Sequence, residues 1–303
     1  MRNLPILLLI VLLIIMGSCT KFINVNLGSM DPQLIVEGVI TTDTMAHKII
    51  LKRTADYFSN QKAERISDAI IMLSDSNAVT HETHKIQMKE DPDSAGIYMT
   101  PSNYFGVKGR IYTINISNVD ANKDGISETY TASCKLNSIA PVDSFTITKR
   151  KMVYEDAFVI QVYLKDPPEE TNYYLFRVWK NDSLVTDSII LWNITDDNFF
   201  SPEFMTNDLK IYLFPRFRHK QYIRDNNTVK LEACGITKDY FNFIREAIEA
   251  YRGQNPMFGS QPANIRTNVI RTSPPLDVGE TGARGYFAAY SVFWKKKIYK
   301  APK

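Results

Sequence analysis

The sequence predicts a mainly β protein built from two β-rich domains, the first a sandwich and the second carrying one packed α-helix. Short runs rich in Ile, Val, Thr and Tyr recur along the chain from Gln33 onward, and Gly, Pro, Asn or Asp interrupt them every ten to fifteen residues. This pattern is typical of antiparallel strands. A single stretch has helical periodicity, and the 303 residues suit about two domains after removal of a leader.

The amino terminus has the pattern of a secretory signal peptide, which we assign to residues 1–18. One positive charge at Arg2 precedes the apolar run Leu4–Met16, and the small residues Gly17 and Ser18 follow it. Cys19 comes directly after, as in a bacterial lipobox, so we predict that its thiol is lipidated and that residues 19–32 are anchor and tether. The alternative is an uncleaved anchor helix, although thirteen apolar residues are short for a membrane span.

Residues 33–140 are predicted to form the sandwich from six strands. Tyr112, Ile114 and Ile116 alternate with more polar neighbours, so we expect these three side chains to point into the core. The expected strands are Gln33–Thr42, Lys48–Thr54, Ala69–Asp75, Ala78–Gln87, Arg110–Asn118 and Glu128–Lys135.

Residues 141–303 are predicted to form the second domain, which begins after a short linker at Pro141. A helix is expected at 237–252, where Thr237 can cap its start, Gly253 can end it, and apolar residues recur at three- and four-residue steps. The expected strands are Ser144–Lys151, Ala157–Lys165, Asn172–Lys180, Leu184–Trp192, Asp208–Phe214, Val229–Cys234 and Gly285–Tyr299.

The charge balance excludes one function class. With 36 Lys and Arg against 33 Asp and Glu, the chain lacks the concentrated basic surface of a nucleic-acid-binding protein. Only the carboxyl end is locally basic. Its lysines are either a solvated strand end or a contact for anionic headgroups or an acidic partner. They are Lys295, Lys296, Lys297, Lys300 and Lys303.

Two cysteines remain if Cys19 is lipidated, and both lie in strand-like runs. Cys134 and Cys234 are compatible with a disulfide, which an export compartment permits, and equally with two small buried side chains. The sequence contains no Cys-x-x-Cys motif that would indicate redox or zinc chemistry.

One loop resembles a calcium site, because oxygen-bearing side chains alternate before a glycine. Its candidate ligands are Asp120, Asn122, Asp124 and Glu128. The twelfth position, where an EF-hand needs a bidentate Glu, is Thr131, and strands rather than helices flank the loop. A hairpin turn at Asp124-Gly125 explains the same residues, so we predict no cofactor and keep calcium as the alternative.

We find no catalytic constellation in the sequence. His81 and His84 are one residue too close for a zinc-protease motif and lie in an extended segment, so they are expected at the surface. No Gly-x-Ser-x-Gly elbow occurs, and no pair of carboxylates can be singled out as acid and base. The sequence therefore favours a non-enzymatic protein.

Taken in order, these features resemble the outer-membrane lipoproteins catalogued as domain of unknown function 4249. The resemblance covers nearly the whole mature chain and rests on the order of several short motifs. They are Cys19, Leu34–Gly38, Arg53–Phe58, Gly96–Tyr98, Gly109–Tyr112, Tyr130–Ala132, Pro141–Ser144, the helix after Thr237, Asn264–Ile265 and Gly285–Phe287.

The resemblance implies an immunoglobulin-like amino-terminal β-sandwich and a place among TonB-dependent transport systems, whose lipoproteins serve as accessory subunits. It supplies no catalytic residues. The segment Thr20–Asn26 lacks the acidic residues of a surface-export signal, so the sequence leaves open which face of the outer membrane the protein occupies. Four triplets also match the O-glycosylation pattern of such bacteria, at Thr44, Ser94, Ser183 and Ser188.

The leading functional hypothesis is a lipid-anchored, non-enzymatic outer-membrane protein that partners a TonB-dependent transporter and captures a ligand or caps its channel. An alternative is a structural or assembly lipoprotein without a small ligand. A third is a hydrolase whose site is assembled from distant residues. An aromatic pocket would favour the first hypothesis, and a broad exposed apolar patch the second.

Overall fold

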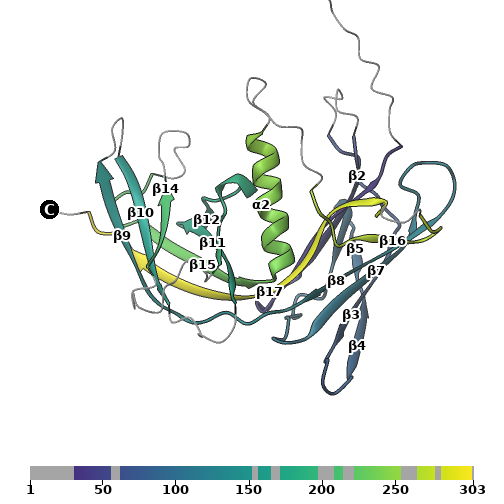
Figure 1. Cartoon of the computed structure of the whole chain (residues 1–303), viewed down its shortest axis with the longest axis horizontal. Coiled ribbons are helices and arrows are strands. Elements are labelled where there is room, and N and C mark those ends of the chain that lie inside the picture. Colours follow the sequence, from purple (N-terminus) through teal and green to yellow (C-terminus); the bar gives the residue numbers. More distant parts are fainter. Residues whose placement is uncertain are drawn as a thin grey trace, which may run out of the picture. The chain divides into compact units, whose positions relative to one another are not determined.

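The computed structural model describes residues 31–55, 62–151, 156–164, 171–196, 208–213, 222–253, 265–276 and 281–301 (Figure 1). The predicted signal peptide and Cys19 lie outside these ranges. Residues 32–303 form one compact unit, and its described part contains three β-sheets. No α-helix in the described ranges is long and apolar enough to cross a membrane.

The largest sheet has nine strands and runs through both halves of this unit. Its order is β12 (Ser183–Leu184), β11 (Tyr173–Lys180), β15 (Thr228–Ile236), β17 (Ala283–Ile298), β1 (Leu34–Thr41), β2 (Lys48–Arg53), β6 (Ser94–Met99) and β5 (Lys89–Asp91), and β13 (Asn193–Asp196) also pairs with β11. The smaller sheets have the orders β16 (Ile270–Ser273), β8 (Glu128–Lys135), β7 (Ile111–Val119), β3 (Ile70–Ser76), β4 (Thr83–Gln87), and β14 (Asp208–Leu213), β10 (Asp156–Leu164), β9 (Val142–Lys151).

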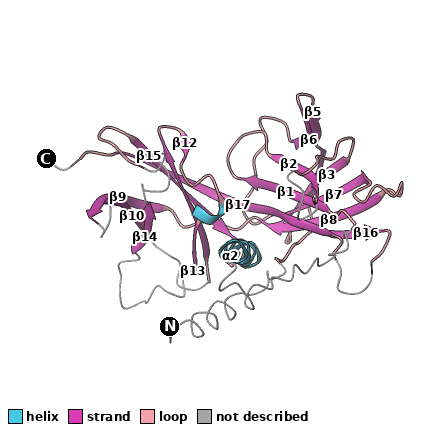
Figure 2. Ribbon diagram, turned by 90° about the horizontal axis from the view of Figure 1, so that it is seen from above, coloured by secondary structure: helices cyan, strands magenta, loops and turns pink. Residues whose placement is uncertain are grey.

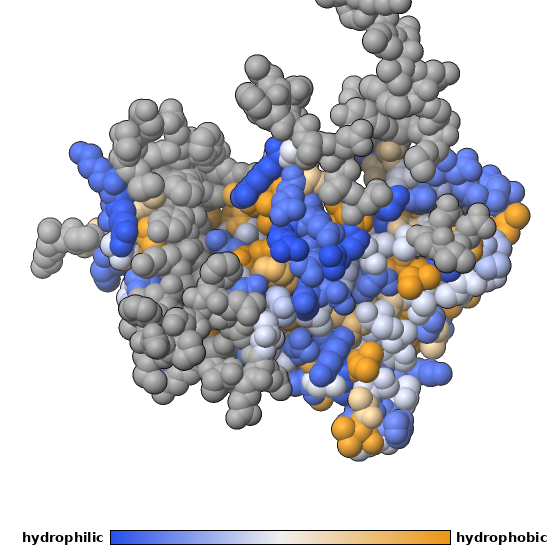
Figure 3. Space-filling view, viewed as in Figure 1, coloured by the Kyte–Doolittle hydropathy of each residue, from blue (hydrophilic) through white to orange (hydrophobic). Residues whose placement is uncertain are grey.

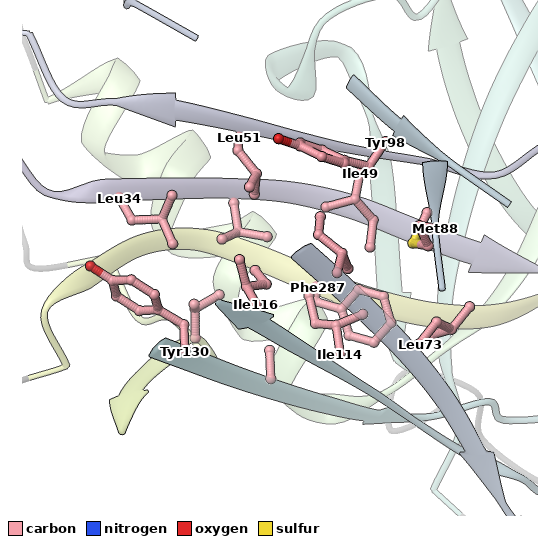
Figure 4. Packing of buried hydrophobic residues seen from close by; sticks show 14 of the residues in the cluster. Leu34, Ile49, Leu51, Leu73, Met88, Tyr98, Ile114, Ile116, Tyr130 and Phe287 are labelled. Carbon is pink, nitrogen blue, oxygen red and sulfur yellow. The ribbon is translucent and has the colours of Figure 1, made fainter. Parts of the chain in front are cut away.

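The first sandwich forms where the five-stranded sheet packs on β1, β2 and the start of β17. Figure 4 shows Leu34, Ile49 and Leu51 pointing from one sheet toward Ile114 and Ile116 of the other. The expectation that Tyr112, Ile114 and Ile116 point inward is confirmed, because all three are fully buried. The chain is thus mainly β, with an immunoglobulin-like sandwich at its amino-terminal end.

A second apolar core lies between β9 and β10 on one side and β11 and β15 on the other. Phe145, Ile160 and Val162 meet Phe176 and Leu231 there. The five-stranded sheet covers the part of the nine-stranded sheet that carries the first apolar core, and the three-stranded sheet covers the part that carries the second.

β17 joins the two sandwiches in one continuous strand. Its first half pairs in parallel with β1, from Leu34↔Ala283 to Thr41↔Tyr290, and its second half pairs antiparallel with β15, from Gly235↔Ser291 to Thr228↔Ile298. Figure 1 shows this strand, in yellow, running from β16 toward β9. The first sandwich, expected to consist of residues 33–140, therefore also contains β16 and the first half of β17.

The predicted helix at 237–252 is confirmed as α2 (Lys238–Arg252). The Thr237 hydroxyl oxygen accepts a hydrogen bond from the Tyr240 backbone N–H at 3.3 Å, and Gly253 follows the last turn. Tyr240, Ile244 and Ile248 are buried against the nine-stranded sheet. Figure 2 shows α2 end-on beside β17, and Figure 3 shows that its outward face is hydrophilic.

Two predicted strands differ from the structure. The segment Leu184–Trp192 contributes only β12, after which the short 3-10 helix η1 (Ile189–Leu191) turns its apolar residues toward α2 instead of toward a neighbouring strand. The strand expected from Ala78 begins at Thr83, because the Asn77 side chain accepts hydrogen bonds from the backbone at 79 and 80 and holds a turn there.

Candidate functional site

A cavity of about 890 Å³ opens on the face of the nine-stranded sheet that also supports α2. All three tryptophans of the chain, Trp179, Trp192 and Trp294, line this cavity. Further aromatic side chains come from α2 and β17, namely Tyr240, Phe243, Tyr286 and Tyr290. We call this cavity the aromatic pocket.

Strand register places the polar residues of the aromatic pocket together. Arg177 of β11 lies opposite Glu232 of β15, and Glu232 in turn lies opposite Trp294 of β17. At the next position on the same face, Trp179 of β11 lies opposite Lys230 of β15. Since alternate residues of a strand share a face, the same face is apolar under α2 and becomes charged where α2 no longer covers it.

An ion pair lies within the aromatic pocket. Arg177 Nη2 bonds to Glu232 Oε1, and the Trp179 indole N–H donates to Glu232 Oε2 at 2.9 Å. The Glu232 side chain is 3% exposed and the Arg177 side chain 19%. Burial lowers the pKa of Arg177, but Coulombic interactions with Tyr290 and Glu232 raise it overall, so the guanidinium stays charged.

Cations occupy ring faces in the aromatic pocket. Lys230 Nζ lies 5.6 Å from the ring centroid of Trp179 and 5.5 Å from that of Trp294, and it forms an ion pair with Asp182 at 2.8 Å. The guanidinium of Arg177 lies 5.5 Å from the ring centroid of Trp192. These contacts fix the orientations of the indoles and of both cations relative to each other.

The loop between β1 and β2 forms another wall and is held by polar contacts. The Trp294 indole N–H donates to Asp43 Oδ2 at 3.0 Å. His47 is buried: its Nδ1 accepts from the Thr41 backbone N–H at 3.4 Å, and its Nε2 donates to the Asp43 carbonyl oxygen at 3.2 Å. Burial lowers the pKa of His47, so the neutral ring that these two bonds require is favoured.

The carboxylates that line the aromatic pocket are already paired within the protein. Glu232 is engaged with Arg177 and Trp179, Asp43 with Trp294, and Glu37 with Lys52 at 2.9 Å. Aromatic carbon surface and a few oriented polar groups are the usual composition of a small-molecule site. Across the residues that the structure describes, no group of three or more His, Cys, Asp or Glu side chains is arranged to hold a metal ion.

The disulfide alternative for Cys134 and Cys234 is wrong, since both are free, buried thiols. Cys134 Sγ lies 3.7 Å from the Ala289 carbonyl oxygen, and Cys234 Sγ lies 3.8 Å from Glu232 Oε1. Burial raises the pKa of both thiols, which makes them unreactive. Each behaves as the small buried side chain that was the other alternative.

The calcium candidates serve a turn and a buried ion pair. Asp120 accepts hydrogen bonds from the backbone N–H groups of residues 124 and 125, and Asp124 accepts from that of residue 126 and from the Asn122 amide. Glu128 turns into the protein, where it bonds to Arg271 at 2.7 Å and accepts from the Tyr130 hydroxyl at 2.8 Å. Residues 120–127 join β7 to β8, so these side chains are engaged in contacts within that loop and in the Glu128–Arg271 pair.

The remaining predicted residues do not meet at the aromatic pocket. His81 and His84 are exposed, as expected. Of the glycosylation candidates, Thr44 and Ser183 are exposed, whereas Ser94 and Ser188 are half-buried. Within the basic carboxyl end, the Lys297 ammonium donates to the Phe145 carbonyl oxygen at 3.4 Å, and Lys303 lies outside the described residues.

None of the aromatic or charged residues that line the aromatic pocket was predicted from the sequence as a site residue. Arg177 and Glu232 each stand among apolar residues of a strand, in Tyr173–Lys180 and Thr228–Ile236. A charge within an otherwise apolar strand is a signal, because it must find a partner or a ligand when the strand is buried. The signal identifies single residues but does not say which of them meet.

Comparisons with known proteins define a family. No curated protein matches the chain. Among solved structures, the alpha chain of the chicken interferon gamma receptor is similar to it over 68% of this chain and 90% of that one, at 10% identity and a TM-score of 0.19. The family model described as Domain of unknown function (DUF4249) matches residues 20–296, and the chain therefore belongs to this family.

Proposed function

We propose that the protein is a lipid-anchored, non-enzymatic protein of the outer membrane that captures a small ligand and passes it to a TonB-dependent transporter. Three features support the proposal: the lipobox that ends at Cys19, the resemblance to outer-membrane lipoproteins, and the aromatic pocket. The first two concern the anchor and the partner, and the third concerns the ligand.

The aromatic pocket carries the ligand-capture part of the proposal. Its volume of about 890 Å³ falls in the range of roughly 300–1,000 Å³ that is usual for ligand sites. Arg177 and Glu232 are charged residues held within it, where isolated charges would be unfavourable. An assembly protein without a small ligand would have no use for such a site, which makes this alternative less attractive.

The partner is tested by purification of the tagged protein from native outer membranes in mild detergent, followed by mass spectrometry of the co-eluting proteins. We expect a β-barrel transporter at a stoichiometric ratio. Recovery of the protein alone, or with assembly factors, would contradict the accessory role and favour the structural alternative.

The anchor is tested separately by Cys19→Ala, with Cys134→Ala as the matched control. We expect Cys19→Ala to abolish lipidation and processing and to release the protein from the membrane fraction, because acyl chains supply the anchoring energy. Cys134→Ala should leave the intact mass of the lipid-modified amino terminus and the fractionation unchanged. Normal processing of Cys19→Ala would show that Cys19 is not the lipidation site.

A further inference from the structure

We propose that the aromatic pocket selects organic anions that carry a planar aromatic ring, with the ligand carboxylate on Arg177 and the ring against the indoles. This inference rests on the proposed ligand-capture function and names the chemical class of the ligand.

Arg177 has hydrogen-bond donors to spare. Its Nη2 bonds to Glu232, but its Nε is buried and no described residue accepts a hydrogen bond from it. Because Nε itself is closed off from solvent, a ligand would reach the guanidinium through its exposed part: the Arg177 side chain is 19% exposed and lines the aromatic pocket. The planar guanidinium matches a carboxylate, which can accept two of its N–H groups at once.

The ring faces argue against a cationic ligand. Aromatic cages bind quaternary ammonium groups through their π-faces. Here Lys230 already lies over Trp179 and Trp294, and Arg177 lies over Trp192, at 5.5 to 5.6 Å from the centroids. A ligand cation would have to compete with these two cations for the ring faces, so the aromatic pocket favours a ligand without a positive charge.

The acceptors argue against a ligand rich in hydroxyl groups. A sugar needs several free carboxylate or amide oxygens to accept its O–H groups. In the aromatic pocket, Glu232, Asp43 and Glu37 are already paired within the protein. The indole N–H groups of Trp179 and Trp294 are also engaged, so these rings offer a ligand mainly carbon surface, which suits a flat aromatic ring.

The proposal is tested by isothermal titration calorimetry of the full-length lipidated protein in detergent, with 2-naphthoate and its neutral isostere 2-naphthamide. We expect naphthoate to bind at least about ten-fold more tightly, as hydrogen bonds to a charged partner imply. The double variant Arg177→Met/Glu232→Gln removes both charges without leaving either alone, and it should bring the two affinities together.

The matched control is Arg266→Met, which removes an arginine paired with Glu246 of α2 and outside the aromatic pocket. It should keep the preference for naphthoate. A second variant, Trp192→Leu, should weaken both probes while the far-UV circular dichroism spectrum stays unchanged.

Three results would overturn the proposal: no detectable binding of naphthoate to the wild type, equal binding of naphthoate and naphthamide to the wild type, or a preference for naphthoate that survives in the double variant. Equal binding of the two probes would still leave the proposed ligand capture intact. The transporter partner is judged independently by the co-purification experiment, so failure of one does not imply failure of the other.

Discussion

Replacing Glu232 by glutamine tests the energetic coupling within the aromatic pocket. Glutamine keeps the shape of the side chain and an acceptor for the Trp179 indole N–H, but it leaves the Arg177 charge without its partner. We expect Glu232→Gln to lower the free energy of unfolding, Arg177→Met to lower it by at least as much because Glu232 is the more deeply buried partner, and the double variant to lower it less than the sum of the two.

The magnitude follows from the burial of the pair. Removing one partner of a buried ion pair costs about 3–5 kcal/mol, and replacing both can be neutral. Because the Arg177 side chain keeps 19% exposure while Glu232 keeps 3%, water can partly solvate the arginine. We therefore expect about 2–3 kcal/mol for Glu232→Gln, about 0–2 kcal/mol for the double variant, and a coupling energy of at least about 2 kcal/mol.

The assay is urea unfolding of all three variants, followed by far-UV circular dichroism and by tryptophan fluorescence. The three tryptophans all line the aromatic pocket, so their emission reports on it directly. Lys123→Met is the control, because the Lys123–Glu64 pair is 58% and 56% exposed and exposed ion pairs contribute little to stability. Additive single effects, or a cost of Glu232→Gln no larger than the control, would refute the reasoning.

Three further predictions concern the backbone, a titration and the thiols. Gly285→Ala should cost more than about 3 kcal/mol by thermal melting, because its Cβ would lie 2.0 Å from a β1 carbonyl oxygen, whereas Gly109→Ala, with a similar positive φ and open space, should cost only about 1 kcal/mol. Stability should fall as the pH decreases below about 6.5, because the unfolded chain then binds a proton that the lowered pKa of His47 excludes from the folded protein. His47→Gln should flatten this pH dependence, as measured by urea titrations at several pH values. Cys134 and Cys234 should resist Ellman's reagent in the native protein and react after unfolding, and rapid native labelling would contradict their burial.

Local patterns predicted much of the fold correctly. The alternation around Ile114 and the cap at Thr237 depend on residues close together in the sequence, so they identify an inward strand face and a helix start without knowledge of the neighbours. The same local reading was wrong for Leu184–Trp192, whose apolar residues suit a strand but pack against α2 through η1. There the tertiary contact overrode a local preference.

The aromatic pocket depends instead on strand pairing between distant segments. Arg177, Glu232 and Trp294 meet only because β15 lies between β11 and β17 in a particular register. A shift of one residue would turn these side chains to the opposite face of the sheet. Nothing in the separate runs of the sequence specifies that neighbourhood.

The β class, the helix and the inward strand faces are all predictable from the sequence, because they follow from periodicity and capping over a few residues. That β17 belongs to both sandwiches, and that three tryptophans and the Arg177–Glu232 pair line one cavity, is visible only in the folded chain. Hydrogen bonds between strands join residues far apart in the chain, and the packing of the whole core selects which strands pair.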